Sequence, residues 1–344
     1  MKTLANYIHN RNYGCRVKEY TYHGLKTVSI ENDMISVVVL ADKGTDIIEF
    51  VYKPLDVDFM WHSFNGIKNP AGYVQTCEAQ GGSFLDYYEG GWQELFPTFG
   101  ANSDYYGAKI GIHGEVWNLP WSYAILDDKP EIVSVRFWVR AVRTPFYLEK
   151  TLTLKLHDAS LYMDERVVNE GNMPLEFMWG HHPAFGPVFL DDSCRICVDG
   201  DVKIIPDAQC SLEASASDWP LAQDRKGNRI DISRVQHPES RLNISCALEG
   251  FKQGRFHIVN TSMGLGFGLD WDKALFPYIW IWEPNATQKS APWYGRDYVL
   301  GIEPWSAIPG DFDEVKKKDK GIRIAPGESI LTSLRAYAFR EETC

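Results

Sequence analysis

The side chains best suited to proton transfer are two adjacent histidines, His181 and His182, and a late glutamate, Glu303. The histidines follow a strand-like run, residues 175–179. Successive side chains on a strand point to opposite faces, so one histidine can face a ligand while the other packs, and the pair would chelate a metal poorly. Pro183 lacks a backbone donor, and we expect it to end the ladder just after the pair. These residues leave open which histidine faces a site and whether either does chemistry.

Glu303 ends an apolar run and precedes a proline. With Trp305 and Trp282 near it, its carboxyl group would be partly removed from water. Desolvation raises a carboxyl pKa and makes the group a better base near neutral pH. Glu283 is also followed by a proline and is a rival candidate. The alternative for either glutamate is an ordinary ion pair at a sheet edge.

Two segments rich in glycine and aromatic residues could supply a binding surface. Residues 90–100 include Trp92 and Glu94, and residues 111–121 include His113. Glycine lets the backbone approach a ligand closely. A tryptophan face can stack on the C–H edges of a sugar, and His113 could donate a hydrogen bond. The alternative is a packed aromatic turn.

The elements that would position these residues are strands, because the hydrophobic period is two along most of the chain. Their even spacing between Gly, Pro, Asn and Asp turns is typical of an all-β sandwich or barrel with mostly antiparallel strands. No helical stripe lasts beyond a turn or two, and no linker divides the chain. We therefore expect one domain, residues 1–344. The expected strands are residues 34–40, 47–52, 132–142, 148–156, 161–169, 175–179, 256–260, 264–269, 278–282 and 330–339.

Composition excludes several classes of function. The 344 residues carry a formal net charge of -11, which disfavours nucleic acid or an anionic membrane as a partner. No run approaches the roughly 20 apolar residues of a membrane span. The polar start of the chain predicts no export signal, and seven scattered cysteines are typical of reduced thiols. We expect a cytoplasmic protein with a small-molecule partner and no metal or organic cofactor, and we leave a homodimer open.

Taken together, the motifs resemble the aldose 1-epimerase family of the galactose mutarotase-like superfamily, over most of the chain. Each motif is weak alone, and the resemblance rests on their order and spacing. They are Asp42-Lys43-Gly44-Thr45, Gly91-Trp92 with Phe96-Pro97, His113-Gly114 ending in Pro120-Trp121, His182-Pro183, Gly301-Ile302-Glu303-Pro304 and Ala325-Pro326-Gly327-Glu328-Ser329.

The resemblance implies a β-supersandwich with a sugar cleft, in which anomers of a free sugar interconvert by ring opening. It implies His182 as general acid, Glu303 as base and His113 as a substrate-binding residue. A carboxylate beside a histidine favours both charged forms, which would suit these roles. To the substrate-binding set we add Trp92, Glu94, Trp282, Glu283 and Trp305, on their position beside the motifs.

The sequence departs from the family at several points. The arginine usual near the first glycine motif is replaced by the segment Trp92-Gln93-Glu94. This loss argues against a sugar phosphate, although Arg296 could compensate. The Asp-His pair that holds sugar hydroxyls has no clear match, because Asp270 and Asp272 lack its context.

Two other functions remain open on the same fold. A non-catalytic carbohydrate-binding protein would keep the tryptophans and tolerate loss of His182 or Glu303. A glycoside hydrolase or lyase would need two carboxyl groups about 5 to 9.5 Å apart across a cleft. Glu94 or Glu283 with Glu303 are the pairs that the sequence offers for it.

Overall fold

The computed structural model describes residues 11–72, 83–308, 310, 312–317 and 320–340. The described chain is mostly antiparallel β-sheet, as the sequence predicts, with two short helices, α1 (Ser83–Tyr87) and α2 (Phe312–Lys317). Residues 1–10, which bear on the expected lack of an export signal, lie outside the described residues.

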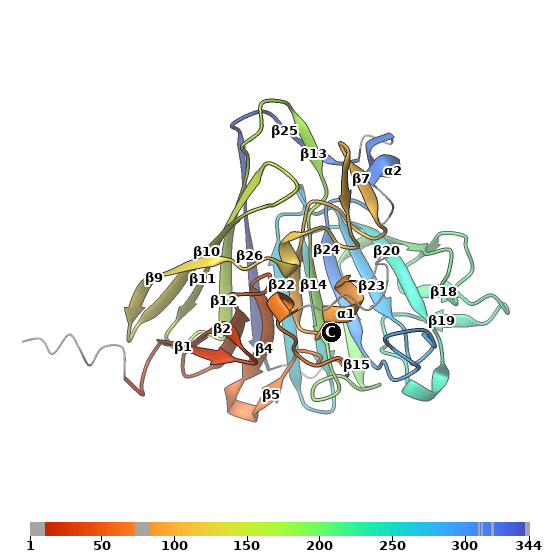
Figure 1. Ribbon diagram of the computed structural model, residues 1–344. Helices are drawn as coiled ribbons and strands as arrows, with labels where there is room; N and C mark the ends of the chain where they lie inside the picture. The colour runs from red at the N-terminus through yellow and green to blue at the C-terminus, as the bar shows by residue number, and fades with distance from the viewer. Residues whose placement is uncertain (1–10, 73–82, 309, 311, 318–319, 341–344) are drawn as a thin grey trace, which may run out of the picture.

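The larger sheet has twelve strands, and its centre carries the two histidines. Its strands follow the order β1-β2-β3-β4-β6-β14-β24-β23-β20-β16-β17, with β5 paired to β4. Figure 1 shows β14, β24 and β23 side by side near the middle of the molecule, close to α1. The bounds are β1 (Arg16–Tyr22), β2 (Leu25–Glu31), β3 (Ile35–Leu40), β4 (Asp46–Tyr52), β5 (Val57–Asp58), β6 (Trp92–Leu95), β14 (Gly180–Phe185), β24 (Leu300–Trp305), β23 (Tyr278–Glu283), β20 (Ile244–Phe251), β16 (Gly200–Pro206) and β17 (Ser217–Asp218).

The second sheet has eight strands and packs against one face of the first. Its order is β15-β21-β22-β26-β12-β11-β10-β9. One hydrophobic cluster includes buried side chains of both sheets, among them Val37, Phe50, Phe137, Leu154 and Phe267. The bounds are β15 (Cys194–Cys197), β21 (Arg255–Asn260), β22 (Leu265–Trp271), β26 (Ser329–Phe339), β12 (Ser160–Asn169), β11 (Phe146–Lys155), β10 (Ile132–Arg140) and β9 (Ser122–Lys129).

Three two-stranded sheets complete the described strands. They are β13 (Leu175–Phe177) with β25 (Ile322–Ile324), β7 (Ser103–Tyr105) with β8 (Ala108–Ile110), and β18 (Leu221–Gln223) with β19 (Arg229–Asp231). The expected strand at residues 175–179 is therefore shorter, because Met178 and Trp179 leave the β13 ladder. Their amides donate to the Pro97 carbonyl and the Ser306 hydroxyl instead.

Pro183 does not end the ladder, which corrects the sequence-based expectation. Strand β14 continues to Phe185, and Pro183 pairs with Trp92 of β6. The missing proline donor is tolerated because the ladder resumes at the next residue, where the Ala184 amide donates to the Gly91 carbonyl.

The cysteines only partly match the expectation of reduced thiols. Cys15, Cys194, Cys210 and Cys246 are free and buried, whereas Cys197 is disulfide-bonded. Among the described residues, no helix is long and apolar enough to cross a membrane.

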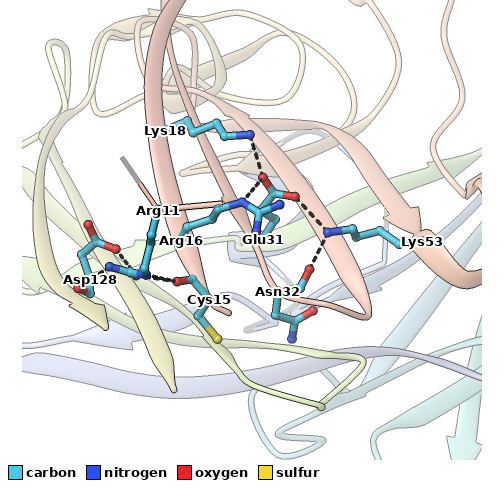
Figure 2. Close-up of polar contacts among 8 residues, drawn as sticks. All are labelled: Arg11, Cys15, Arg16, Lys18, Glu31, Asn32, Lys53 and Asp128. Carbon is cyan, nitrogen blue, oxygen red and sulfur yellow. Dashed lines mark hydrogen bonds and ion pairs between the residues drawn. The ribbon is translucent and has the colours of Figure 1, made fainter. Parts of the chain in front are cut away.

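Polar contacts fasten the segment before β1 to the second sheet and β1 to β2 (Figure 2). Arg11 donates to the Cys15 carbonyl and pairs with Asp128 of β9. Nearby, three cations surround Glu31 of β2: Arg16 at 2.7 Å, Lys18 at 2.8 Å and Lys53 at 3.0 Å.

Candidate functional site

The register of β14 and β24 brings His182 and Glu303 together. Gly180 pairs with Trp305 in this antiparallel ladder, so the residues two further along, His182 and Glu303, also lie opposite each other. Directly opposed side chains share a face of the sheet. The Nε2 atom of His182 lies 3.3 Å from the Oε1 atom of Glu303. We call this face the site face.

A row of polar side chains crosses the sheet at this level. Gln93 of β6 pairs with His182, and Trp280 of β23 pairs with Glu303. On the far side of Gln93, Ile47 of β4 pairs with Trp92 of β6, so the next residues in the antiparallel register, Asp46 and Gln93, also lie opposite each other. Five adjacent strands, β4, β6, β14, β24 and β23, therefore each present one of these side chains to the site face.

The other partners of the histidine–glutamate pair are also fixed. The Oε2 atom of Glu303 accepts a hydrogen bond from Nε1 of Trp305 at 2.9 Å. The Nδ1 atom of His182 lies 3.3 Å from the hydroxyl oxygen of Tyr88. Glu303 is 1% exposed and His182 is 5% exposed, so both sit in a medium of low polarity.

Burial opposes charge on both members of the pair. It raises the pKa of Glu303 to about 8, although the Trp305 hydrogen bond acts the other way. It lowers the pKa of His182 to about 4. The sequence-based expectation that the two groups favour each other's charged forms is therefore reversed, because desolvation outweighs their attraction. Near neutral pH the pair holds one transferable proton, on Glu303.

His113 joins this site from the loop after β8. Its ring lies 5.6 Å from the ring of His182 and stacks on Phe99, also at 5.6 Å. The backbone of His113 is left-handed, with φ 63°, and Gly114 follows it. Burial, with the nearby His182, holds the pKa of His113 well below its usual value. Its buried Nδ1 atom has no hydrogen-bond partner among the residues that the structure describes. A neutral imidazole there can still donate or accept one hydrogen bond.

Two of the expected tryptophans reach the site. The Trp282 ring lies 5.9 Å from His182, and Trp305 both binds Glu303 and stacks on Phe99 at 3.5 Å. Trp280, Trp282 and His113 are half-buried. They are therefore more accessible to solvent than His182 and Glu303, which they border.

Three expected substrate-binding residues lie on the other face of the sheet. Trp92 and Glu94 flank Gln93 in β6, so their side chains point opposite to it. Trp92 donates to Nδ1 of His181 at 3.4 Å, and Glu94 pairs with Lys150 of the second sheet at 3.0 Å. This inner face also holds His181, 3.1 Å from Glu165.

Glu283 also lies on the inner face, because it is three residues along β23 from Trp280 and side chains alternate between faces. Its carboxylate accepts the Gln236 amide at 2.6 Å, and burial raises its pKa to about 8. Neither Glu94 nor Glu283 shares a face with Glu303. The geometry therefore gives no support to the two-carboxylate arrangement of a glycoside hydrolase.

Four aromatic residues at the site were missed by the sequence analysis. Tyr88 contacts His182, and its ring lies 5.7 Å from Trp61 and 4.9 Å from Phe84. Trp293 packs 5.7 Å from Trp282. No local pattern marks these residues, because they reach the site from a short helix and from loops.

A buried ionic cluster lies close to Tyr88. The Nζ atom of Lys43 pairs with Asp46 and, at 2.7 Å, with Glu89. All three side chains are at most 2% exposed. Burial raises the pKa of Asp46 well above its usual value, and the charge of Glu89 adds to this effect. In the sequence, Lys43 stood out only as part of the Asp42-Lys43-Gly44-Thr45 motif.

Other candidates lie away from the pair or are otherwise engaged. The Arg296 guanidinium stacks over Phe64 at 4.8 Å and donates to the Trp293 carbonyl at the edge of the site. Asp270 and Asp272 line an open groove of about 510 Å³ on the outer face of the second sheet. Among the described residues, no three His, Cys, Asp or Glu side chains gather to hold a metal ion.

Comparison with known proteins assigns the chain to a family. A family model described as "Domain of unknown function (DUF4432)" matches residues 22–336. The chain belongs to this family. No curated protein matches the sequence.

Solved structures give the fold of this DUF4432 chain. It superposes with a TM-score of 0.75 on a protein from Klebsiella pneumoniae that carries a provisional aldose 1-epimerase name, at 14% identity over 98% of this chain and 87% of that one. A galactose mutarotase-like protein from Lactobacillus casei gives a TM-score of 0.61 at 16% identity, over 91% of this chain and 100% of that one. A galactose mutarotase-like protein from Clostridium acetobutylicum gives a TM-score of 0.64 at 15% identity, over 95% of this chain and 99% of that one. The fold is thus galactose mutarotase-like, as the sequence motifs suggested.

Proposed function

We propose that this protein is a cofactor-independent isomerase that interconverts the anomers of a free aldose. The observation that carries the proposal is the 3.3 Å distance between His182 Nε2 and Glu303 Oε1, two buried groups. Their pKa values are shifted toward the neutral forms, which leaves the pair one proton near neutral pH. The two oxygens that exchange a proton in ring opening are bonded to the same sugar carbon. An acid and a base side by side match that arrangement.

The reaction would begin with neutral Glu303 and neutral His182. Glu303 gives its proton to the ring oxygen while Nε2 of His182 takes the proton of the C1 hydroxyl. The bond between C1 and the ring oxygen breaks, and C1 becomes an aldehyde. After rotation about C1–C2, the ring oxygen attacks the other face of C1, and both protons return.

This order of roles reverses the one that the family resemblance implies for the first step. The reverse order operates when the ring closes, because ring opening leaves Glu303 ionised and His182 protonated. Each proton transfer is typically worth about 10²- to 10⁴-fold in rate. His113, beside His182, would bind a sugar oxygen, and the half-buried Trp280 and Trp282 would stack on the ring.

The test is anomer exchange, followed by polarimetry or NMR with fresh α-anomers of a panel of free aldoses. The parent should accelerate exchange of at least one sugar. Glu303→Gln and His182→Asn should each remove about 100-fold or more of that acceleration. Glu283→Gln is the matched control, because it changes an equally buried carboxyl on the inner face and keeps an oxygen for the Gln236 amide.

If Glu303→Gln accelerates anomer exchange as well as the parent does, Glu303 takes no part in the proton transfers. A parent that accelerates no sugar but binds one by calorimetry would instead be a carbohydrate-binding protein on this fold.

A further inference from the structure

The two ring nitrogens of His182 have different neighbours. Nε2 faces Glu303 at 3.3 Å, and Nδ1 faces the hydroxyl oxygen of Tyr88 at 3.3 Å. A neutral imidazole carries its proton on one nitrogen only, and the hydrogen bond made by one nitrogen decides the state of the other.

The proposed reaction requires one particular tautomer, and this step rests on that proposed function. Nε2 must be bare to take a proton from the C1 hydroxyl, so Nδ1 must carry the proton of neutral His182. When Nε2 becomes protonated, Nδ1 still keeps its own proton. In both states an N–H at Nδ1 needs an acceptor, and a hydroxyl oxygen has lone pairs for it.

Packing holds Tyr88 in place to act as this acceptor. Its side chain is 1% exposed, and its ring stacks on Phe84 at 4.9 Å. Trp61 and Trp293 lie 5.7 and 6.0 Å from it. The hydroxyl therefore has little freedom to leave Nδ1.

The charges around Tyr88 and His182 come from three directions. Glu303 lies on β24, Glu89 follows Tyr88 in the chain, and Asp46 with its partner Lys43 lies at the start of β4. His113 faces His182 from the loop after β8. Burial, and then these carboxylates, raise the pKa of Tyr88 well above its usual value. The residue thus stays a neutral hydroxyl, which stabilises the charged form of His182 less than a carboxylate in its place would.

We propose that Tyr88 is a positioning residue that accepts a hydrogen bond from Nδ1 of His182 and so leaves Nε2 bare toward Glu303. The arrangement resembles the carboxylate that orients a catalytic histidine in serine proteases, with a neutral oxygen in its place. Because the acceptor is neutral, the histidine remains a weak base that returns its proton readily.

The direct test reads the tautomer of His182 by ¹⁵N NMR of histidine-labelled protein near pH 6.5. His182→Asn identifies the His182 signals among the nine histidines. The parent should show a protonated Nδ1 and a bare Nε2. In Tyr88→Phe the population should move toward protonated Nε2. A parent with protonated Nε2, or a tautomer that Tyr88→Phe leaves unchanged, would overturn the proposal.

Kinetics provide the second test on any sugar that the parent accelerates. Tyr88→Phe should lower kcat by about 10- to 100-fold, part of the range for one proton transfer, with KM changed less than about twofold. Tyr105→Phe is the control, because its buried hydroxyl donates to the Glu176 carbonyl away from the site, and it should keep the parent rate. Equal kcat in parent and Tyr88→Phe would also overturn the proposal.

The two proposals fail separately. If no sugar is accelerated, the isomerase proposal fails, while the NMR measurement still decides the role of Tyr88 in the parent protein. If Tyr88→Phe does not fold, the tautomer of the parent still tests the inference, because protonated Nε2 would exclude it.

Discussion

At the scale of single residues, the site is governed by the cost of burying charge. Glu303 and His182 lie within ion-pair distance, yet their pKa values move in the directions that favour the neutral forms. Desolvation prevails because both side chains are almost wholly removed from water. The pair then offers an acid and a base at the same pH without carrying charge at rest.

The pH dependence of anomer exchange follows from these values. The pair holds one proton between about pH 4, the pKa of His182, and about pH 8, the pKa of Glu303. Above this window Glu303 loses its proton and the acid is missing. Below it His182 gains one and the base is missing. The enzyme-dependent kcat/KM should therefore be bell-shaped, and its limbs report the pair as a unit.

A pH series from 4 to 9.5, corrected for the uncatalysed reaction, measures this profile. An enzymatic rate that keeps rising beyond pH 9 would mean that Glu303 acts from its ionised form. The basic limb should disappear in any residual activity of Glu303→Gln.

At the scale of elements, strand β14 serves both faces of its sheet. His182 faces Glu303, while His181 faces Glu165 of β12 in the second sheet. Gly180 is the first residue of β14, and the Trp305 ring covers the position where a side chain of residue 180 would lie. A Cβ atom there would come 2.1 Å from the Trp305 ring, and that ring is stacked at 3.5 Å on Phe99.

Gly180→Ala should therefore disturb both stability and the site. Because the Trp305 ring is stacked on Phe99, it can make room only by disturbing that stack, and otherwise strand β14 must shift. Overpacking of this kind typically costs about 1–3 kcal/mol. Because Trp305 Nε1 binds Glu303, activity should fall as well. Thermal unfolding and the exchange assay check the two effects. Gly72→Ala is the control, since no described residue lies within 4 Å of its added methyl group. A Gly180→Ala protein with parental melting and rate would contradict the packing described here.

At the scale of the whole molecule, ion pairs fasten the edge of the larger sheet. Glu31 is surrounded by Arg16, Lys18 and Lys53 (Figure 2). Burial works against ionisation of this carboxyl, but the three cations prevail and lower its pKa from 4.5 to about 2. A depressed pKa means stability that is present above about pH 4.5 and is lost as the pH falls toward 2.

Glu31→Gln should thus lower the free energy of unfolding at pH 7. The difference in unfolding free energy between the variant and the parent should be smaller at pH 2.5. Urea unfolding at the two pH values measures both. Lys129→Gln, which removes an exposed partner of Asp127, is a control expected to change little. A gap that stays constant between pH 7 and pH 2.5 would show that the cluster does not stabilise the fold through charge.

The sequence predicts the periodic elements well and the site in part. Strands such as β10 and β12 carry a clear alternation of apolar residues, so their existence follows from the period alone. His182, Glu303 and His113 stand in recognisable motifs. Trp92, Glu94 and Glu283 stood beside the motifs but lie on the inner face, because a position one residue away reverses a side chain's direction. Tyr88 and the Lys43 cluster depend on pairings between distant segments, which local patterns do not carry.

The polar row draws on residues 46, 93, 182, 280 and 303, which are spread over most of the chain. During synthesis, strand β14 would be made long before its neighbour β24 leaves the ribosome. Until then, β14 lacks the partner on one side, and an unpaired strand can bind another chain. Assembly of the site therefore has to wait until β24, residues 300–305, has been made. A nascent chain interrupted before Leu300 would expose β14, with its two histidines, as an open edge.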